Sequence, residues 1–169
     1  MNGVRFLHDR KLPFPRRSEF HIYGTCYTAK YIGHGQKTVA FLLDSYYEVT
    51  YCGLVLKVVC PAQEDMECEV MCHLNKMHCE ACVQLVRAGQ VSFEALPEMP
   101  AWLCEYAMPL DRFLQQAVAL PARCVLSALL AILRAAEVQV IVSDLGFYNF
   151  GVIRDEVSII DTGSRSFEK

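Results

Sequence analysis

The chain lacks a surplus of positive charge. Its 16 lysines and arginines stand against 19 aspartates and glutamates, which gives a net charge of −3. A nucleic-acid binder draws most of its affinity from the neutralisation of phosphates by Lys and Arg. The balance therefore argues against a nucleic-acid partner.

The chain also lacks a long apolar run. None approaches the roughly 18 uncharged residues that a membrane span requires, and the richest stretch, 118–133, contains Pro121 and Arg123. No secretory signal is expected, because Arg, Lys and Asp are spread through the first seventeen residues. We expect a cytoplasmic protein without a membrane span, whose nine cysteines are reduced thiols.

What is present is the composition of a folded domain. The chain has 169 residues, of which 53% are hydrophobic and 21% charged, and this indicates one domain or a compact two-lobed one. Residues 1–19, with two prolines, are expected to form an irregular arm.

The order of strand and helix patterns predicts an α+β fold with a sheet-rich first half. Two strands within 23–43 should be joined by a turn at Gly33 and Gly35, and Pro97 and Pro100 should lie in a loop. The other expected strands are 49–59, 83–86, 101–106, 138–142, 150–153 and 157–160. The expected helices are 62–77, 110–119 and 122–136; the last is apolar nearly all round and should be buried.

Three polar residues near the end of the sequence indicate phosphoryl transfer. Asp144 is followed five residues later by Asn149, and Asp161 comes after a short hairpin. This chemistry needs a group that positions or deprotonates a hydroxyl, oxygen ligands for Mg²⁺ and a cation on the phosphates. The segment offers the first two.

Lys57 is the candidate cation. It lies among five aliphatic residues in 54–59, where a lysine is costly unless it is paired or reaches water. The following helix offers carboxylates, of which Glu67 is our first choice and Glu69 the second. The turn at Gly33 and Gly35 is either plain hairpin chemistry or a phosphate cover.

The stretch from about residue 27 to 163 resembles the eukaryotic-type protein kinase fold in a divergent, very short form. Val55-Leu56-Lys57 is similar to the phosphate-lysine motif, and Asp161-Thr162-Gly163 to the metal-binding loop. The resemblance implies a β-rich N-lobe of about 20–104, a hinge of about 105–109 with Cys104 as gatekeeper, and a strongly reduced helical C-lobe of about 110–169. It assigns ATP binding to Gly33, Gly35, Val39, Val55, Lys57, Glu67, Glu105, Ala107 and Asp111.

The implied activity is ATP- and Mg²⁺-dependent transfer to a hydroxyl, as in an atypical Ser/Thr protein kinase acting on a protein substrate that the sequence does not identify. Asp144 would be the catalytic residue, and Asn149 and Asp161 would hold the metal. Compact kinases of this design include proteins that pathogens deliver into host cells, so delivery stays open beside a cytoplasmic location.

The departures from the family pattern leave two alternatives. Val142-Ser143 replaces the usual His-Arg, Gly146 stands where many members have a basic residue, and the sequence stops six residues after Gly163. A catalytically inactive pseudokinase that acts as a binding module fits the short C-lobe. A small-molecule phosphotransferase of the aminoglycoside- or choline-kinase type shares the same acidic pattern.

A cysteine cluster offers a different chemistry. Cys68, Cys72, Cys79 and Cys82 lie within fifteen residues, together with two histidines, and Cys79-Glu80-Ala81-Cys82 has zinc-knuckle spacing. Structural zinc sites usually place a longer span between ligand pairs. Free thiols are the favoured interpretation.

Overall fold

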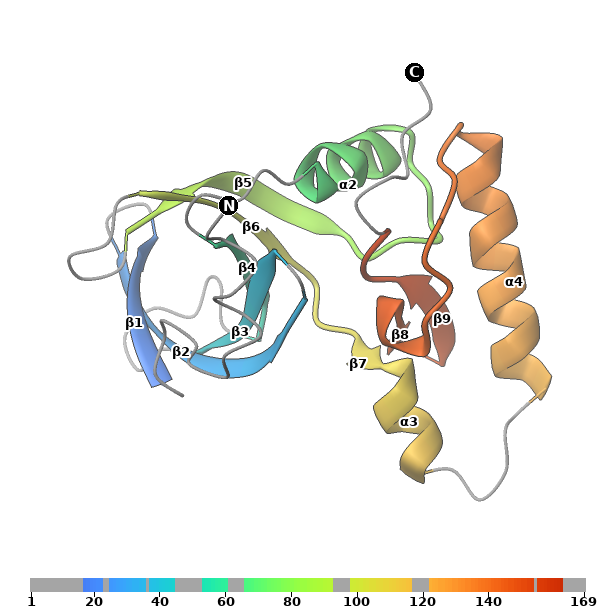
Figure 1. Ribbon diagram of the computed structural model, residues 1–169, viewed down its shortest axis with the longest axis horizontal. Coiled ribbons are helices and arrows are strands. Elements are labelled where there is room, and N and C mark those ends of the chain that lie inside the picture. Colours follow the sequence, from blue (N-terminus) through green and yellow to red (C-terminus); the bar gives the residue numbers. More distant parts are fainter. Residues whose placement is uncertain are drawn as a thin grey trace, which may run out of the picture. The chain divides into compact units, whose positions relative to one another are not determined.

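The structure is a computed structural model that describes residues 17–22, 25–35, 37–44, 53–60, 66–92, 98–116, 122–153 and 155–162. It confirms an α+β fold. The chain forms two compact units, residues 1–65 with 86–105 and residues 66–85 with 106–169 (Figure 1). The chain crosses from the first unit to the second for the last time at residues 105–106, inside the segment expected to be a hinge.

The first unit is built on a curled six-stranded sheet with the strand order β1-β2-β3-β4-β6-β5. Each neighbouring pair from β1 to β4 is antiparallel, and so is the pair β4–β6. The strands are β1 (Arg17–Ile22), β2 (Thr25–His34), β3 (Thr38–Asp44), β4 (Val55–Val59), β5 (Leu85–Val91) and β6 (Met99–Cys104).

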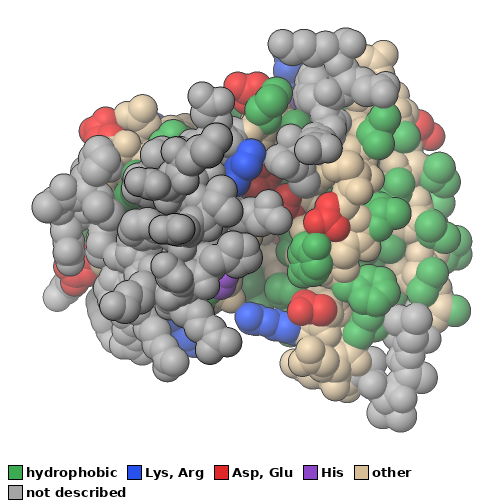
Figure 2. Space-filling model, viewed as in Figure 1, with side chains coloured by type: hydrophobic (Ala, Val, Ile, Leu, Met, Phe, Trp, Pro, Cys, Tyr) green, Lys and Arg blue, Asp and Glu red, His purple; other side chains and the backbone are tan. Residues whose placement is uncertain are grey.

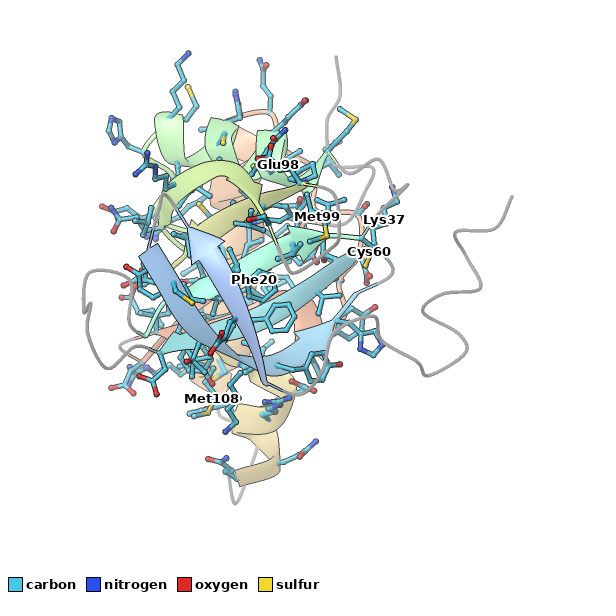
Figure 3. The ribbon with its side chains drawn as sticks, turned by 90° about the vertical axis from the view of Figure 1, so that its left-hand side faces the viewer. Phe20, Lys37, Cys60, Glu98, Met99 and Met108 are labelled. Atoms are coloured by element: carbon cyan, nitrogen blue, oxygen red, sulfur yellow. The ribbon has the colours of Figure 1, made fainter. Side chains whose placement is uncertain are left out.

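One face of this sheet carries the hydrophobic core of the unit. Phe20 and Phe41 pack with their ring centroids 4.9 Å apart. Figure 3 shows Phe20, Cys60 and Met99 gathered on this side of the sheet, and all three belong to the buried cluster. Because side chains alternate along a strand, Leu56 and Val58 of β4 face this core while Lys57 points to the other face.

The described residues of the second unit form three helices and a small sheet. Its helices are α2 (Glu67–Lys76), α3 (Leu110–Gln116) and α4 (Ala122–Glu137), and a short 3₁₀ turn spans Phe147–Asn149. The antiparallel sheet has the order β7 (Met108–Pro109), β8 (Phe150–Ile153), β9 (Glu156–Ile159). None of the helices within the described residues is long and apolar enough to cross a membrane.

Backbone hydrogen bonds join the segment after α2 to the hairpin. The amide of Ile159 donates to the carbonyl of Ala81 at 2.7 Å, and the amide of Val83 donates to the carbonyl of Ile159 at 3.0 Å. The side chain of Asn75 closes the end of α2, because its Nδ2 donates to the carbonyl of Val83 and its Oδ1 accepts from the amide of Leu85. These bonds hold α2 beside β9.

Several expected elements agree with the structure. The strand at 150–153 is confirmed, and β9 starts one residue before the expected 157–160. The turn joining β2 to β3 contains Gly35, whose amide donates to the carbonyl of Thr38 at 2.9 Å. The helix expected over 62–77 is seen from Glu67 to Lys76, and residues 62–65 lie outside the described part. So do residues 49–52 of the expected strand 49–59 and residues 117–119 of the expected helix 110–119.

Three expectations about backbone were wrong. No strand covers 138–142, because Gln139 adopts a left-handed φ of 63° and the amide of Val140 bonds back to the carbonyl of Ala135. Arg17 begins β1 rather than lying in an arm that reaches residue 19, since it pairs with Lys30 of β2; residues 1–16 are outside the described part. Pro100 belongs to β6, whose register with β4 begins only at Ala101, so no ladder bond to β4 is lost.

The expectation that 122–136 is a buried helix was also wrong. Of the residues in α4, only Cys124, Ala131 and Ala135 are buried. The helix packs on β9, and small residues on that face allow a close approach. Its leucines point elsewhere and are exposed.

Candidate functional site

The segment between α4 and β8 carries the candidate site, and two buried valines anchor it. Val140 and Val142 are buried, whereas Leu145 and Phe147 are exposed. The carbonyl of Val138 lies 3.0 Å from Nε2 of His73 on α2. Apolar anchors before Ser143 thus place the following residues at the surface of the second unit.

Asp144 is held by two hydrogen-bond donors from its own loop. The amide of Gly146 donates to Oδ1 at 3.0 Å, and the phenol of Tyr148 donates to Oδ2 at 2.8 Å. These bonds favour the charged carboxylate and lower the pKa of Asp144 below its ordinary value, the amide being the larger cause. Asp144 is therefore ionised at neutral pH.

Asn149 is the residue that joins the three predicted polar groups. It is buried, with 4% of its surface exposed. Its Nδ2 donates to the carbonyl of Asp144 at 3.1 Å. Its own carbonyl accepts from the amides of Ile160 at 2.9 Å and Asp161 at 3.2 Å. The amide side chain thus keeps Oδ1 as its only atom with lone pairs to offer a cation.

The hairpin explains why Asp161 lies beside Asn149. In the β8–β9 register Phe150 is opposite Ile159, so the residues just outside the ladder on each strand meet at its open end. The hydrogen bond that the Tyr148 phenol donates to Asp144 raises the pKa of Tyr148, and desolvation and the negative charges of Asp144 and Asp161 raise it further. The backbone of Asp161 is thus held beside Asn149 at the open end of the hairpin.

Gly146 is required for space rather than for backbone freedom, because its φ is −61°. A Cβ there would lie 2.4 Å from Cε1 and 2.5 Å from Cζ of Tyr148. The Tyr148 ring therefore packs over the backbone of Gly146 while its phenol reaches the Asp144 carboxylate. Any side chain at 146 would move Tyr148, which gives a local reason for the missing basic residue.

Other predicted site residues of the second unit lie on several elements. Glu67 at the start of α2 is 4% exposed, whereas Glu69 is exposed, so Glu67 is the inward-facing acid. Ala107 is buried beside Gly151 of β8. Asp111 lies in the first turn of α3, and its buried Oδ1 has no hydrogen-bond partner within the described residues.

The remaining predicted residues belong to the first unit. The ammonium of Lys57 lies 5.8 Å from the ring centroid of Trp102, its neighbour across β4 and β6, which is within cation–π range. Val39 and Val55 are buried, and Glu105 follows β6 half-buried. Gly33 lies at a register shift between β2 and β3. The pairing of Lys57 with Glu67 stays a prediction.

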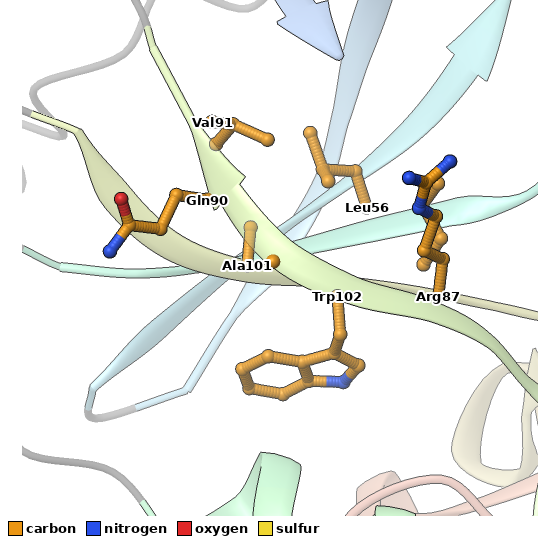
Figure 4. Close-up of a pocket in the computed structure, with 8 residues that line it drawn as sticks. Leu56, Arg87, Gln90, Val91, Ala101 and Trp102 are labelled. Carbon is orange, nitrogen blue, oxygen red and sulfur yellow. The ribbon is translucent and has the colours of Figure 1, made fainter. Parts of the chain in front are cut away.

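A small hollow between β5 and β6 is not suited to a nucleotide. Figure 4 shows Arg87, Gln90 and Trp102 among its lining residues. Its volume is only about 10 Å³, whereas sites for small molecules usually enclose on the order of 300–1,000 Å³. None of the predicted ATP-binding residues lines this hollow.

The cysteine cluster does not assemble a metal site. Nowhere in the described ranges do three or more His, Cys, Asp or Glu side chains gather around a position for a metal ion. Burial, followed by the nearby Cys79, raises the pKa of Cys82 to about 12. Cys82 is therefore a neutral thiol at neutral pH.

Sequence reasoning missed Tyr148, the residue in most direct contact with the Asp144 carboxylate. The available signal was its spacing, four residues after Asp144 and two after a glycine. That spacing lets a phenol reach back over a 3₁₀ turn.

No family model matches the sequence, and no curated protein matches it.

Proposed function

We propose that this chain is an ATP- and Mg²⁺-dependent phosphotransferase with a two-lobed, protein kinase-like arrangement, and that it transfers the γ-phosphoryl group to a protein hydroxyl. The observation that carries the proposal is the set of hydrogen bonds through Asn149. One residue fixes the backbone of Asp144 and the backbone of Asp161 at the same time. An acidic residue that merely lies at the surface does not need a buried asparagine to fix its backbone.

The donor set suits Mg²⁺. This ion is usually held by one or two carboxylates together with substrate phosphates, rather than by a cage of protein ligands. Asn149 through Oδ1 and Asp161 through its carboxylate would hold it, and they sit at the open end of a hairpin with fixed register. The absence of a larger acidic cluster in the described residues is compatible with such a site. When bound, the ion would neutralise charge on the transferring phosphoryl group.

Asp144 would position the acceptor hydroxyl. The lowered pKa makes Asp144 a weak base, but its ionised carboxylate accepts charge-assisted hydrogen bonds. Phosphoryl transfer with a loose transition state relies on positioning and electrostatics more than on early proton removal. Lys57 would supply the positive charge on the phosphates, with Glu67 as its counter-ion.

One observation favours a second candidate, an inactive nucleotide-binding module. The phenol of Tyr148 occupies Oδ2 of Asp144, where the acceptor hydroxyl would bind. Because 60% of Tyr148 is exposed, the ring can be displaced by rotation. Catalysis requires that displacement; a pseudokinase does not.

The experiment compares nucleotide binding and phosphate transfer in three variants that each replace one aspartate by asparagine. Asp161→Asn should weaken Mg²⁺–ATP binding and transfer together. Asp144→Asn should retain binding and lower transfer by about 10²-fold or more. Asp155→Asn is the matched control, since Asp155 is exposed in the hairpin turn with φ 69°, a conformation that asparagine tolerates.

Binding without transfer in the parent protein would favour the inactive module. No binding of Mg²⁺–ATP at all would contradict both candidates.

A further inference from the structure

Helix α4 carries its small side chains on the inner face and its large apolar side chains on the outer face, the opposite of an ordinary surface helix. Its inner face, on β9, carries small side chains, with Cys124, Ala131 and Ala135 buried. Its outer face carries large ones. The exposed fractions there are 42% for Val125, 59% for Leu126, 53% for Leu129, 45% for Leu130 and 60% for Leu133. A surface helix normally turns its leucines inward and polar residues outward.

The outer leucines form one continuous stripe. Leu126, Leu129, Leu130 and Leu133 follow the spacing i, i+3, i+4, i+7, which places them along a single helix face. Figure 2 shows hydrophobic side chains gathered on the side of the second unit where α4 lies. A patch of this kind covers on the order of 300–600 Å² and is often functional.

The stripe is symmetric about its own centre. Between Leu129 and Leu130 the leucine pattern reads the same in both directions, since Leu126 and Leu133 are equally far from that point. If a second helix of the same sequence runs antiparallel across it, Leu126 lies level with Leu133 of the second copy, and Leu129 with Leu130. This is the self-complementary surface that a twofold dimer requires.

The charges at the two ends of α4 fit the same register. Arg123 lies in its first turn and Glu137 is its last residue, and both are exposed. In the antiparallel pair, Arg123 of each copy lies within one residue of the level of Glu137 of the other. One guanidinium nitrogen of Arg123 donates to the carbonyl of Asp155 at 3.2 Å, which leaves other donors of the fork for a carboxylate.

We propose that α4 is a homodimerisation surface, on which a second copy of this chain packs antiparallel along the stripe Leu126, Leu129, Leu130 and Leu133. Burying the stripe on both copies removes roughly 600–1,200 Å² from water, which lies below the range of stable specific interfaces and within that of weak, transient ones. The dimer is therefore weak and reversible. It does not depend on phosphoryl transfer.

The test is sedimentation equilibrium of the full chain under reducing conditions, between about 1 μM and 1 mM, where an interface of this size should populate dimer. We expect a monomer mass at the low end and a rising dimer fraction above it. Leu130→Lys should weaken the dimer by about 100-fold or more. Met77→Lys is the matched control, because Met77 is 50% exposed and follows α2; it should leave the dimer unchanged.

The charges test the antiparallel register. Arg123→Glu and Glu137→Arg should each weaken association roughly 3- to 30-fold by setting like charges together, and the double variant should restore it. A parallel pair would show no such rescue. Circular dichroism verifies that each variant folds.

A monomer mass at every concentration would overturn the proposal, and so would a dimer that Leu130→Lys leaves intact. A leucine stripe covered by another part of the same chain, or by a different protein alone, would give the first of these results.

Discussion

The close approach of β7 to β8 should make Gly151 intolerant of any side chain. A Cβ at this position would lie 2.5 Å from Cβ of Ala107, 3.0 Å from Cγ2 of Ile160 and 3.2 Å from the carbonyl oxygen of Met108. Two of these neighbours can shift only if the backbone shifts, since Ala107 has no rotatable side chain and the third contact is backbone. Ile160 also donates its amide to Asn149, so the strain would reach the candidate site.

Overpacking of this kind costs about 1–3 kcal/mol. For a chain of this length we expect Gly151→Ala to lower the thermal midpoint by roughly 3–10 °C. Gly33→Ala is the matched control, because no atom lies within 4 Å of a Cβ built there and its φ is not positive. That variant should leave the free energy of unfolding within about 0.5 kcal/mol of the parent's, or raise it slightly.

Calorimetry or circular dichroism melts of the three proteins measure the difference. Equal midpoints for Gly151→Ala and Gly33→Ala would refute the packing of Gly151 against Ala107 and Met108.

Three further predictions concern the site. Tyr148→Phe removes one donor from the Asp144 carboxylate, so the pKa of Asp144 should rise toward its ordinary value of 3.8, as a carboxyl NMR titration can follow; an unchanged titration would mean that the phenol does not hold the carboxylate. Folding lowers the pKa of Asp144, so its carboxylate stabilises the folded chain fully at a pH above its pKa in the unfolded chain. This contribution is lost as the pH falls through the pKa of Asp144 in the folded chain. When the thermal midpoint is measured against pH, the loss should occur at a higher pH in Tyr148→Phe. Transfer activity should survive phosphatase treatment, because Val142-Ser143 lacks the arginine that would bind a loop phosphate; a large loss restored by an upstream kinase would contradict this.

Much of the candidate site followed from sequence because it depends on local geometry. Two short strand patterns, those of β8 and β9, follow each other with only a short turn between them, so a hairpin was expected. Once it forms, Asn149 and Asp161 must meet at its open end. The turn after β2 was likewise indicated by Gly33 and Gly35, since glycine is the residue that tight turns favour.

The parts that sequence did not give depend on contacts between distant segments. The pattern of 122–136 is apolar on every side, so periodicity could not say whether its leucines or its small residues face β9. The hydrogen bond from Tyr148 to Asp144 depends on a ring that fits only over a glycine. Gln139 adopts a left-handed φ where a strand was expected. The sequence did not indicate this, because the residues that favour a left-handed φ are glycine and asparagine rather than glutamine.

The most direct measurement for the central proposal is isothermal titration of the parent chain with ATP, with and without Mg²⁺, followed by γ-phosphoryl transfer from the same preparation. We expect Mg²⁺-dependent binding that Asp161→Asn weakens and Asp155→Asn does not, together with transfer that Asp144→Asn lowers by about 10²-fold or more. Absence of ATP binding in the folded parent, or binding that ignores Mg²⁺ and Asp161, would contradict the proposed phosphotransferase.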